Sequence, residues 1–298
     1  MKVLNFGSLN IDYVYRVQHI VRQGETEPAG ELQLYCGGKG LNQSIAMAKA
    51  GVTVYHAGCV GEDGQILIDA LRDAGVKTQY IRRVPGPSGH TIIQVDDEGN
   101  NAIMLFGGAN QKITEEYVDA VLNDFDDEDI IVLQNEISCL AYIIEKAADR
   151  GIHIVLNPSP YDKVIEEQID VNLVSTLFMN EVEGEQISGD SDPLNMTQTT
   201  QMMYPDMEII LTMGKAGSYY RNGADPIWQK AYRVEAVDTT GAGDTFTGYF
   251  VAGICQGLSA KENLKRAAKA SALAVTRYGA GPSIPALAEV EAFDPAAV

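Results

Sequence analysis

The sequence predicts an α/β protein with a mostly parallel central sheet, helices on both faces of that sheet, and a small separate β-sheet. Short apolar runs alternate with helical patterns along the 298 residues, and several helical patterns end at a glycine. Two segments, about 11–36 and 88–106, instead alternate in β fashion and contain no helical pattern. We expect one domain over 1–298, with these two segments forming a lid over the carboxyl edge of the large sheet.

The elements of the large sheet follow one another in a βαβα order. The strand patterns lie at 2–8, 52–61, 129–136, 152–160, 173–184, 207–217 and 217–223. The helical patterns lie at 41–51, 64–75 and 139–151, and at about 244–257 and 260–277. Ligands of such folds bind beyond the carboxyl ends of the strands. In the second lid segment, "DDEGNN" at 96–101 predicts a hairpin turn.

Composition excludes several functional classes. The 22 basic and 41 acidic residues give a net charge of −19, which argues against nucleic-acid and anionic membrane partners. The four cysteines have no C-x-x-C spacing, and no apolar run is long enough to span a bilayer. The first residues lack the apolar stretch of a secretory signal, so we expect a cytoplasmic protein with reduced thiols.

A glycine turn precedes the helical pattern that starts near Asp244. In "VDTTGAGDTFTG", Gly241, Ala242 and Gly243 come directly before that aspartate. Helix N-termini present free amides, and glycines there leave room for a phosphate. Asp244 would then orient an attacking hydroxyl and accept its proton during phosphoryl transfer. The alternative is that Asp244 only caps the helix, but capping does not require the glycines.

A second glycine-rich stretch, "GGKGLNQS" at 37–44, also opens a helical pattern. Lys39 and Asn42 lie there, and Asn10 and Asp12 follow the first strand. We expect these carboxylate, amide and ammonium groups to converge on one edge of the sheet, where they suit the hydroxyls of a sugar. The alternatives are a turn with a solvated Lys39 and a turn role for Asp12.

Three further motifs follow predicted strands. Glu136 in "LQNE" either faces a ligand or enters the next helix. Asn180 and Glu183 in "NEVE" either help to bind Mg²⁺ beside a triphosphate or cap an acidic helix start. "TMGKAGS" at 212–218 is a turn that contacts a nucleotide, a β-hairpin, or both.

With these motifs in order, nearly the whole chain resembles the ribokinase-like (PfkB) sugar kinases. "GGKGLNQ" and "DTTGAGDTFTG" resemble the two signatures of that family. The resemblance implies ATP-dependent phosphorylation of the primary hydroxyl of a pentose, first of all D-ribose to ribose 5-phosphate. It also implies a β-sheet lid, a homodimer joined through it, Mg²⁺ with ATP, and K⁺ as activator.

The resemblance also implies roles for individual residues. Asp244 is the catalytic base, and the amides of Gly241, Ala242 and Gly243 form an anion hole. The sugar is held by Asn10, Asp12, Gly38, Lys39, Asn42 and Glu136. ATP contacts Asn180, Thr212, Met213, Gly214, Lys215, Ala216, Gly217 and Gly243, and Glu183 acts on Mg²⁺ through water. The ligands of the monovalent cation are Asp238, Thr240, Ala274, Arg277, Gly279 and Ser283.

One departure from the family pattern concerns the sugar. His90 and Thr91 stand where these kinases usually carry small apolar residues, which puts strict ribose specificity in question. The rival functions are a kinase for another sugar or for a nucleoside, and a non-catalytic sugar-binding regulator on the same fold. A nucleoside site would need a stacking aromatic, and loss of Asp244 or the glycines would have favoured the regulator. An NAD-dependent enzyme would need G-x-G-x-x-G after the first strand, and "FGSLNID" lacks it.

Overall fold

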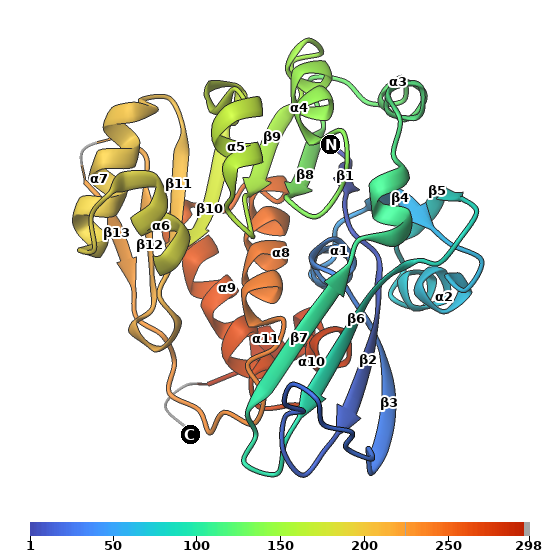
Figure 1. The fold of residues 1–298 in the computed structure, drawn as a ribbon. Helices are drawn as coiled ribbons and strands as arrows, with labels where there is room; N and C mark the ends of the chain where they lie inside the picture. The colour runs from blue at the N-terminus through green and yellow to red at the C-terminus, as the bar shows by residue number, and fades with distance from the viewer. Residues whose placement is uncertain (224, 295–298) are drawn as a thin grey trace.

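The large sheet has nine strands in the described part of the chain, in the order β13-β12-β11-β10-β9-β8-β1-β4-β5 (Figure 1). The computed structural model describes residues 1–223 and 225–294, so the last four residues of the predicted domain lie outside this description. Neighbouring strands from β11 to β5 run parallel, whereas β12 and β13 add an antiparallel edge. The strands are β1 (Val3–Phe6), β4 (Val54–Val60), β5 (Lys77–Arg83), β8 (Ile130–Gln134), β9 (His153–Asn157), β10 (Thr176–Asn180), β11 (Glu208–Thr212), β12 (Ser218–Arg221) and β13 (Ile227–Gln229).

Helices cover both faces of this sheet, which confirms the predicted fold class. Side chains alternate along each strand, so Leu4 and Phe6 enter one core while Val3 enters the other. The first face is covered by α3 (Glu115–Leu122), α4 (Leu140–Ala148), α5 (Lys163–Gln168), α6 (Glu181–Ser188) and α7 (Pro193–Met203). The second is covered by α1 (Lys39–Lys49), α2 (Gln65–Asp73), α8 (Ala242–Cys255), α9 (Ala260–Ala274) and α11 (Leu287–Ala292).

Most predicted elements are present within a few residues of their expected bounds. α1 and α2 are followed by Gly51 and Gly75, which have φ of 91° and 86° and so end these helices as predicted. The sequence patterns missed α3, α5, α7, α11, β5 and β13, the short helix α10 (Ala280–Ser283) and the 3-10 turns η1 (Gly108–Lys112), η2 (Val171–Leu173) and η3 (Gly214–Ala216). Among the described residues, none of the helices combines the length and apolarity that a bilayer crossing requires.

The two β-rich segments form a second sheet of four strands, β3-β2-β6-β7, at one end of the molecule (Figure 1). Its strands are β2 (Asn10–Arg16), β3 (Glu31–Gly37), β6 (Gly89–Val95) and β7 (Asn101–Phe106). The turn between β6 and β7 is closed by a hydrogen bond from the Asp96 amide to the Asn100 carbonyl, at 3.0 Å. Because side chains alternate along a strand, the register gives this sheet one face with Asp12 and Thr91 and an opposite face with Tyr13 and His90.

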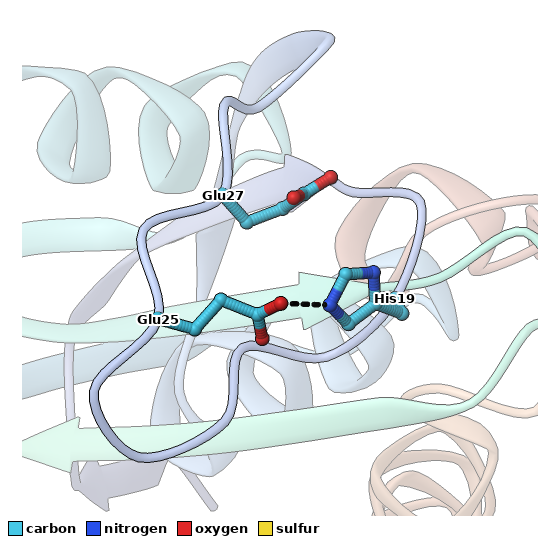
Figure 2. Close-up of side chains that lie close together, drawn as sticks. All are labelled: His19, Glu25 and Glu27. Atoms are coloured by element: carbon cyan, nitrogen blue, oxygen red, sulfur yellow. Dashed lines mark hydrogen bonds and ion pairs between the residues drawn. The ribbon is translucent and has the colours of Figure 1, made fainter.

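The loop between β2 and β3 carries a cluster of potential metal ligands (Figure 2). One ligand atom each of His19, Glu25 and Glu27 lies within 4.8 Å of the others. His19 Nε2 is 2.9 Å from Glu25 Oε1, and the Arg22 amide donates to the other Glu25 oxygen at 3.0 Å. The bonds of Glu25 to His19 and Arg22 hold the loop together. None of the three residues of the cluster is buried, and we assign no metal to it.

Candidate active site

Polar side chains gather where strands of the large sheet end. Ser8 follows β1, Glu136 lies just beyond β8, and Thr212 ends β11. The N-termini of α1 and α8 reach the same edge, because Asn42 of α1 is hydrogen bonded to Asp244 of α8. The contact between these two helices therefore brings together residues that are 202 positions apart in the sequence.

Close packing of α1 against α8 depends on a glycine. A Cβ at Gly248 would lie 2.4 Å from the Cβ of Ala46 and 2.9 Å from the Gln43 carbonyl. Only a residue without a side chain fits there, and the approach places the first turns of the two helices side by side.

Both carboxylate oxygens of Asp244 receive a hydrogen bond from α1. Asn42 Nδ2 donates to Oδ2 and Gln43 Nε2 donates to Oδ1, each at 3.0 Å. The N-cap of α8 is Gly241, with φ of 72°, and no side chain caps this helix. Asp244 is thus not the capping residue, and its carboxylate is fixed by side chains of another helix.

Burial and neighbouring groups act in opposite directions on the pKa of Asp244, and the net pKa is raised. Burial raises the pKa of Asp244, while Lys39 and the amides of Asn42 and Gln43 lower it. Burial would lower the pKa of Lys39, but Asp244, Glu136 and Glu183 together raise it. Lys39 Nζ forms no ion pair with any described residue, so this ammonium group remains available to a ligand.

Glu136 is held at the same edge by two groups that the sequence did not reveal together. The Ser8 hydroxyl donates a hydrogen bond to Glu136 Oε2, and the Lys39 amide donates to that oxygen at 3.1 Å. Burial raises the pKa of Glu136, and Lys39 and Ser8 lower it. Ser8 is a site residue that sequence reasoning missed, since its partner is 128 positions away.

The small sheet contributes Asn10 and Asp12 from β2. Asn110 Nδ2 donates to Asn10 Oδ1 at 2.7 Å, which leaves the Asn10 amino group as the donor available to a ligand. Thr91 Oγ1 donates to Asp12 Oδ1 at 2.5 Å. Burial raises the pKa of Asp12 to about 6, although the Thr91 hydrogen bond lowers it and Glu136 raises it further.

Gly38 and Asn42 complete the groups predicted to contact a sugar. Gly38 has φ of 94°, and a Cβ there would lie 3.0 Å from the Ser8 carbonyl oxygen, so the position requires glycine. The buried Asn42 Oδ1 has no hydrogen-bond partner in the described structure. A buried unpaired carbonyl is costly, and a hydroxyl donor from a ligand would satisfy it.

His90 and Thr91, the two residues that differ from the usual family residues, lie on opposite faces of the small sheet. Thr91 lies beside Asp12, whereas the His90 ring packs against Tyr13 and Phe106, with ring centroids 5.9 and 5.0 Å away. His90 is therefore a residue of the small sheet that faces away from Asp12. Of the two, only Thr91 can alter the groups that Asp12 presents.

A groove of about 750 Å³ runs from the N-terminus of α8 along α9. Five residues predicted to contact ATP line it: Thr212, Gly214, Lys215, Gly217 and Gly243. Met213 is instead buried in the core, and the Ala216 carbonyl accepts a bond from Trp228 Nε1 at 3.3 Å. The sequence missed the stretch from Lys230 to Val234, and Phe246, Ala268, Ser271, Ala272 and Val275, which line the groove as well.

Two positions of the glycine turn, Ala242 and Gly243, differ in their surroundings. The Ala242 amide donates to the Thr239 carbonyl at 3.3 Å, at the long end of the normal range. A Cβ at Gly243 would meet nothing within 4 Å, because this position opens onto the groove. The open side of the turn is thus the Gly243 side.

We expect Gly243→Ala to leave the fold intact and to impair nucleotide use. The methyl group meets no protein atom, so the free energy of unfolding should stay constant or rise by up to about 1 kcal/mol. The same methyl group enters the groove, and KM for ATP should rise about tenfold. The matched control is Gly248→Ala on the same helix, which should instead lose roughly 1–3 kcal/mol of stability. Steady-state kinetics and chemical denaturation check both; an unchanged KM for Gly243→Ala would contradict the expectation.

Asn180 and Glu183 form a capping box at the start of α6. Asn180 Oδ1 accepts from the Glu183 amide at 3.0 Å, and Glu183 Oε2 accepts from the Asn180 amide at 2.9 Å. The alternative of a capped acidic helix start is therefore observed. Neither residue is among those lining the groove, although Glu183 is close enough to influence the pKa of Lys39.

The residues expected to hold a monovalent cation belong to two adjacent segments. The amides of Val237 and Asp238 donate to the Val275 carbonyl at 2.7 and 3.2 Å, beside Ala274 and Arg277. Asp238 accepts from the Thr240 amide and from the Gly279 amide, each at 2.9 Å. Burial would raise the pKa of Asp238, but these bonds and the Thr240 hydroxyl lower it, so the carboxylate stays ionised.

Comparison with known proteins gives matches over the full fold. The family described as pfkB family carbohydrate kinase matches residues 1–287. The ribokinase of Staphylococcus aureus (strain COL) is 34% identical over 307 aligned residues, covering 97% of this chain and 98% of that one. The deoxyribokinase of Salmonella typhi is 30% identical over 303, covering 98% of each. The structure of Arabidopsis thaliana ribokinase complexed with ribose and ATP is similar with a TM-score of 0.84 and 28% identity, covering 98% of this chain and 99% of that one.

Proposed function

The chain belongs to the pfkB family of carbohydrate kinases, and from this premise we propose that it transfers the γ-phosphoryl group of ATP to the primary hydroxyl of D-ribose, giving ribose 5-phosphate. The observation that carries the proposal is the position of Asp244. Its carboxylate lies in the first turn of α8, directly after the glycine turn, and is fixed by Asn42 and Gln43. That is the position of a base beside an anion site.

In the proposed reaction Asp244 accepts the proton of the sugar hydroxyl. The hydroxyl oxygen forms a bond to the γ-phosphorus while the bond from that phosphorus to the β-phosphate oxygen breaks, and ADP leaves. The amides of Gly241, Ala242 and Gly243 offset charge on the transferred group. Gly243, which opens onto the groove, is the residue best placed for this contact. Positioning and charge stabilisation supply most of the rate enhancement in such transfers.

The sugar is proposed to bind between the small sheet and the N-terminus of α1. Donors come from the Asn10 amino group and Lys39, and acceptors from Asp12, Glu136 and Asn42 Oδ1. This alternation of donors and acceptors suits several hydroxyl groups on a small ring. The small sheet would then act as a lid that excludes water from the transfer.

ATP is proposed to occupy the groove beside α9, with its triphosphate toward Gly243. Lys215, Lys230 and Arg233 line this groove in a chain whose net charge is −19, so they supply local positive charge for the phosphates. Mg²⁺ bound with ATP would neutralise phosphate charge. Glu183 fits a role through water, since the capping box occupies only its Oε2. Asn180 would contact ATP with its remaining amide group.

A monovalent cation, K⁺ first of all, is proposed to bind between the segments 238–240 and 274–283. The ionised Asp238 supplies charge, and carbonyl oxygens from Thr240, Ala274, Arg277 and Gly279 with the Ser283 hydroxyl would complete an all-oxygen ligand set. Segment 238–240 leads directly into the glycine turn, so a cation bound there would also hold the amides of the anion site in place. Activity that is equal in K⁺ and in a large organic cation would remove this role.

The experiment that tests the function measures ATP consumption against ribose, 2-deoxyribose, other pentoses, hexoses and nucleosides, with and without K⁺. We expect ribose to give the highest kcat/KM. Nucleosides belong in the panel because Tyr35 lies opposite Asp12 in the β2–β3 register, on the same face of the lid. Activity on nucleosides alone, or on no sugar, would overturn the proposal.

A specific observation favours 2-deoxyribose as the second candidate substrate. The Thr91 hydroxyl already donates to Asp12 Oδ1, so that oxygen has less capacity left for sugar hydroxyls. A sugar with one hydroxyl fewer at this subsite would lose fewer hydrogen bonds to Asp12 than ribose does. The position of Thr91 thus makes the ratio of the two sugars the informative part of the panel.

We expect Thr91→Val to change sugar binding rather than the fold. Losing the donor removes a group that lowers the pKa of Asp12, so this pKa should rise and Asp12 should need a higher pH to ionise. KM for ribose should therefore differ most from the wild type near and just above pH 6, where Asp12 is ionised in the wild type but still largely protonated in the variant, while KM for ATP stays constant. Thr91→Ser keeps the hydroxyl and serves as the control. A ribose to 2-deoxyribose ratio that is equal in both variants and the wild type would exclude a role of Thr91 in selection.

The lid is also proposed to join two copies of the chain. Leu32, Leu34, Met104 and Phe106 are 45%, 50%, 63% and 51% exposed, and the register places all four on the face opposite Asp12. Such an apolar face favours self-association. Sedimentation velocity of the wild type and of Phe106→Asp tests this, and a monomeric wild type would exclude it.

The use of ATP and the four free cysteines support a cytoplasmic setting.

A further inference from the structure

A chain of buried amides lies beneath Asp244 and reaches it through Gln43. It consists of Gln43 from α1, Gln134 at the end of β8 and Asn5 in β1, each with 0% of its surface exposed. Burying three amides is unfavourable unless their hydrogen bonds are made. Here the bonds form one connected path that ends at Asp244 Oδ1, and of the three amides only Gln134 has a side-chain atom, Oε1, without a partner in the described structure.

The direction of every bond in this path is set by a backbone carbonyl. The Gly40 oxygen can only accept, so the group that meets it at 2.8 Å must be Asn5 Nδ2. Asn5 Oδ1 is then turned toward Gln134, whose Nε2 donates to it at 3.1 Å. The same Nε2 donates to Gln43 Oε1 at 2.7 Å. Gln43 is thereby left with its Nε2 facing Asp244.

Glycines make this path sterically possible. A Cβ at Gly7 would lie 2.4 Å from Gln134 Oε1 and 2.7 Å from the Gly40 Cα. Strand β1 and helix α1 can approach each other only because both positions lack side chains. The approach carries the Gly40 carbonyl to within reach of Asn5, where the path begins.

We propose that Gln43 is a positioning residue for phosphoryl transfer: the amide path that starts at the Gly40 carbonyl fixes its side chain as a donor, which holds the Asp244 carboxylate ionised and oriented toward the acceptor hydroxyl. This inference rests on the proposed role of Asp244 as base. A donor whose direction cannot reverse favours an acceptor at Asp244, and a protonated carboxyl would place its hydrogen against that donor or against Asn42. Lys39 of α1 and Glu136 beyond β8 are the charged groups that also face Asp244.

The first test replaces Gln43 by methionine, which has a similar shape but no donor. We expect kcat to fall on the order of 10- to 100-fold with little change in KM for sugar or ATP. The acidic limb of the kcat–pH profile should move to higher pH by roughly half to one unit, because the ionised base has lost a donor. A defect in packing alone would lower stability but would not move this limb.

A second variant keeps the shape and reverses the electrostatics. Gln43→Glu can still accept from Gln134 Nε2, but its other oxygen then faces Asp244 Oδ1. We expect a larger fall in kcat than for Gln43→Met and a further upward movement of the acidic limb. Wild-type kcat and an unmoved limb in a folded Gln43→Glu protein would overturn the proposal.

The matched control is Ser44→Ala, the neighbouring residue of the same helix, which is also fully buried. Ser44 Oγ bonds Asn5 Nδ2 and His56 Nδ1, but Asn5 keeps its bond to the Gly40 carbonyl without it, so the path should persist. We expect reduced stability and an unchanged acidic limb; a limb that moves as far in Ser44→Ala as in Gln43→Met would contradict the path. Measuring Asp244→Asn in the same assay distinguishes a failure of the proposed base from a failure of the positioning role of Gln43. If Asp244→Asn retains activity the proposed base is wrong, whereas if it is inactive and Gln43→Met is normal only the positioning role fails.

Discussion

Replacing Asp244 by asparagine is expected to lower kcat by a factor on the order of 10² to 10⁴, the usual contribution of a general base. Asparagine has the same shape, but its amide does not accept a proton at neutral pH. The sugar and ATP should still bind, because Asn10, Asp12, Lys39 and the groove residues are unchanged. The loss should therefore appear in kcat, while dissociation constants measured by calorimetry stay within about threefold.

The fold should tolerate this change. One of the two donors at Asp244 would meet an amino group in place of an oxygen, at a cost of about 1–3 kcal/mol, while removal of a buried carboxylate offsets part of that cost. The control is Asp192→Asn, which makes the same chemical change at the N-cap of α7, where asparagine caps equally well. Near-normal turnover by a folded Asp244→Asn protein would remove the base assignment.

The sequence predicted the alternation of strands and helices because each element has its own local pattern. The small sheet was also predicted, since its segments show β alternation without helical periodicity. The elements that were missed are short or weakly patterned: β13 has three residues and α10 has four. β5 was not recognised because it is an edge strand with charged residues and no buried one, and α7 because its apolar residues follow no clear helical periodicity.

The sequence alone could associate candidate site residues that are close together in the chain, but not those that pair across the fold. The glycine turn and Asp244 are adjacent in sequence, so the sequence alone could link them in one motif. Ser8 and Glu136 are 128 positions apart, and Gln134 and Gln43 are 91 apart, so no spacing rule links either pair. Asn180 and Glu183 are three positions apart, so the sequence could offer a capped helix start as one of its two alternatives, and the structure shows that capping box.

Replacing Lys39 by methionine is the second change with a large expected effect. Lys39 lowers the pKa of both Asp244 and Glu136, and it is the cation that faces three carboxylates. Without it kcat/KM for the sugar should fall on the order of 100-fold, since a charge-assisted hydrogen bond contributes about 1.5–3 kcal/mol. Lys49→Met is the control: it removes a charge from the same helix, where Lys49 Nζ donates to the Ile284 carbonyl, and kcat/KM should stay near the wild-type value.

The pH dependence of Lys39→Met should have opposite signs for activity and for stability. A base must be ionised, so a raised pKa of Asp244 moves the acidic limb to higher pH, and activity relative to the wild type should recover as the pH rises. A carboxyl whose folded pKa lies above its unfolded value stabilises the fold only while protonated, and that contribution is lost as the pH rises through the folded pKa. The unfolding free energy of Lys39→Met relative to the wild type should therefore fall over the range in which its activity recovers. Rate profiles and denaturation at matched pH values check both trends. If activity and stability declined together as the pH rose, Lys39 would support the fold without tuning the charge of the base.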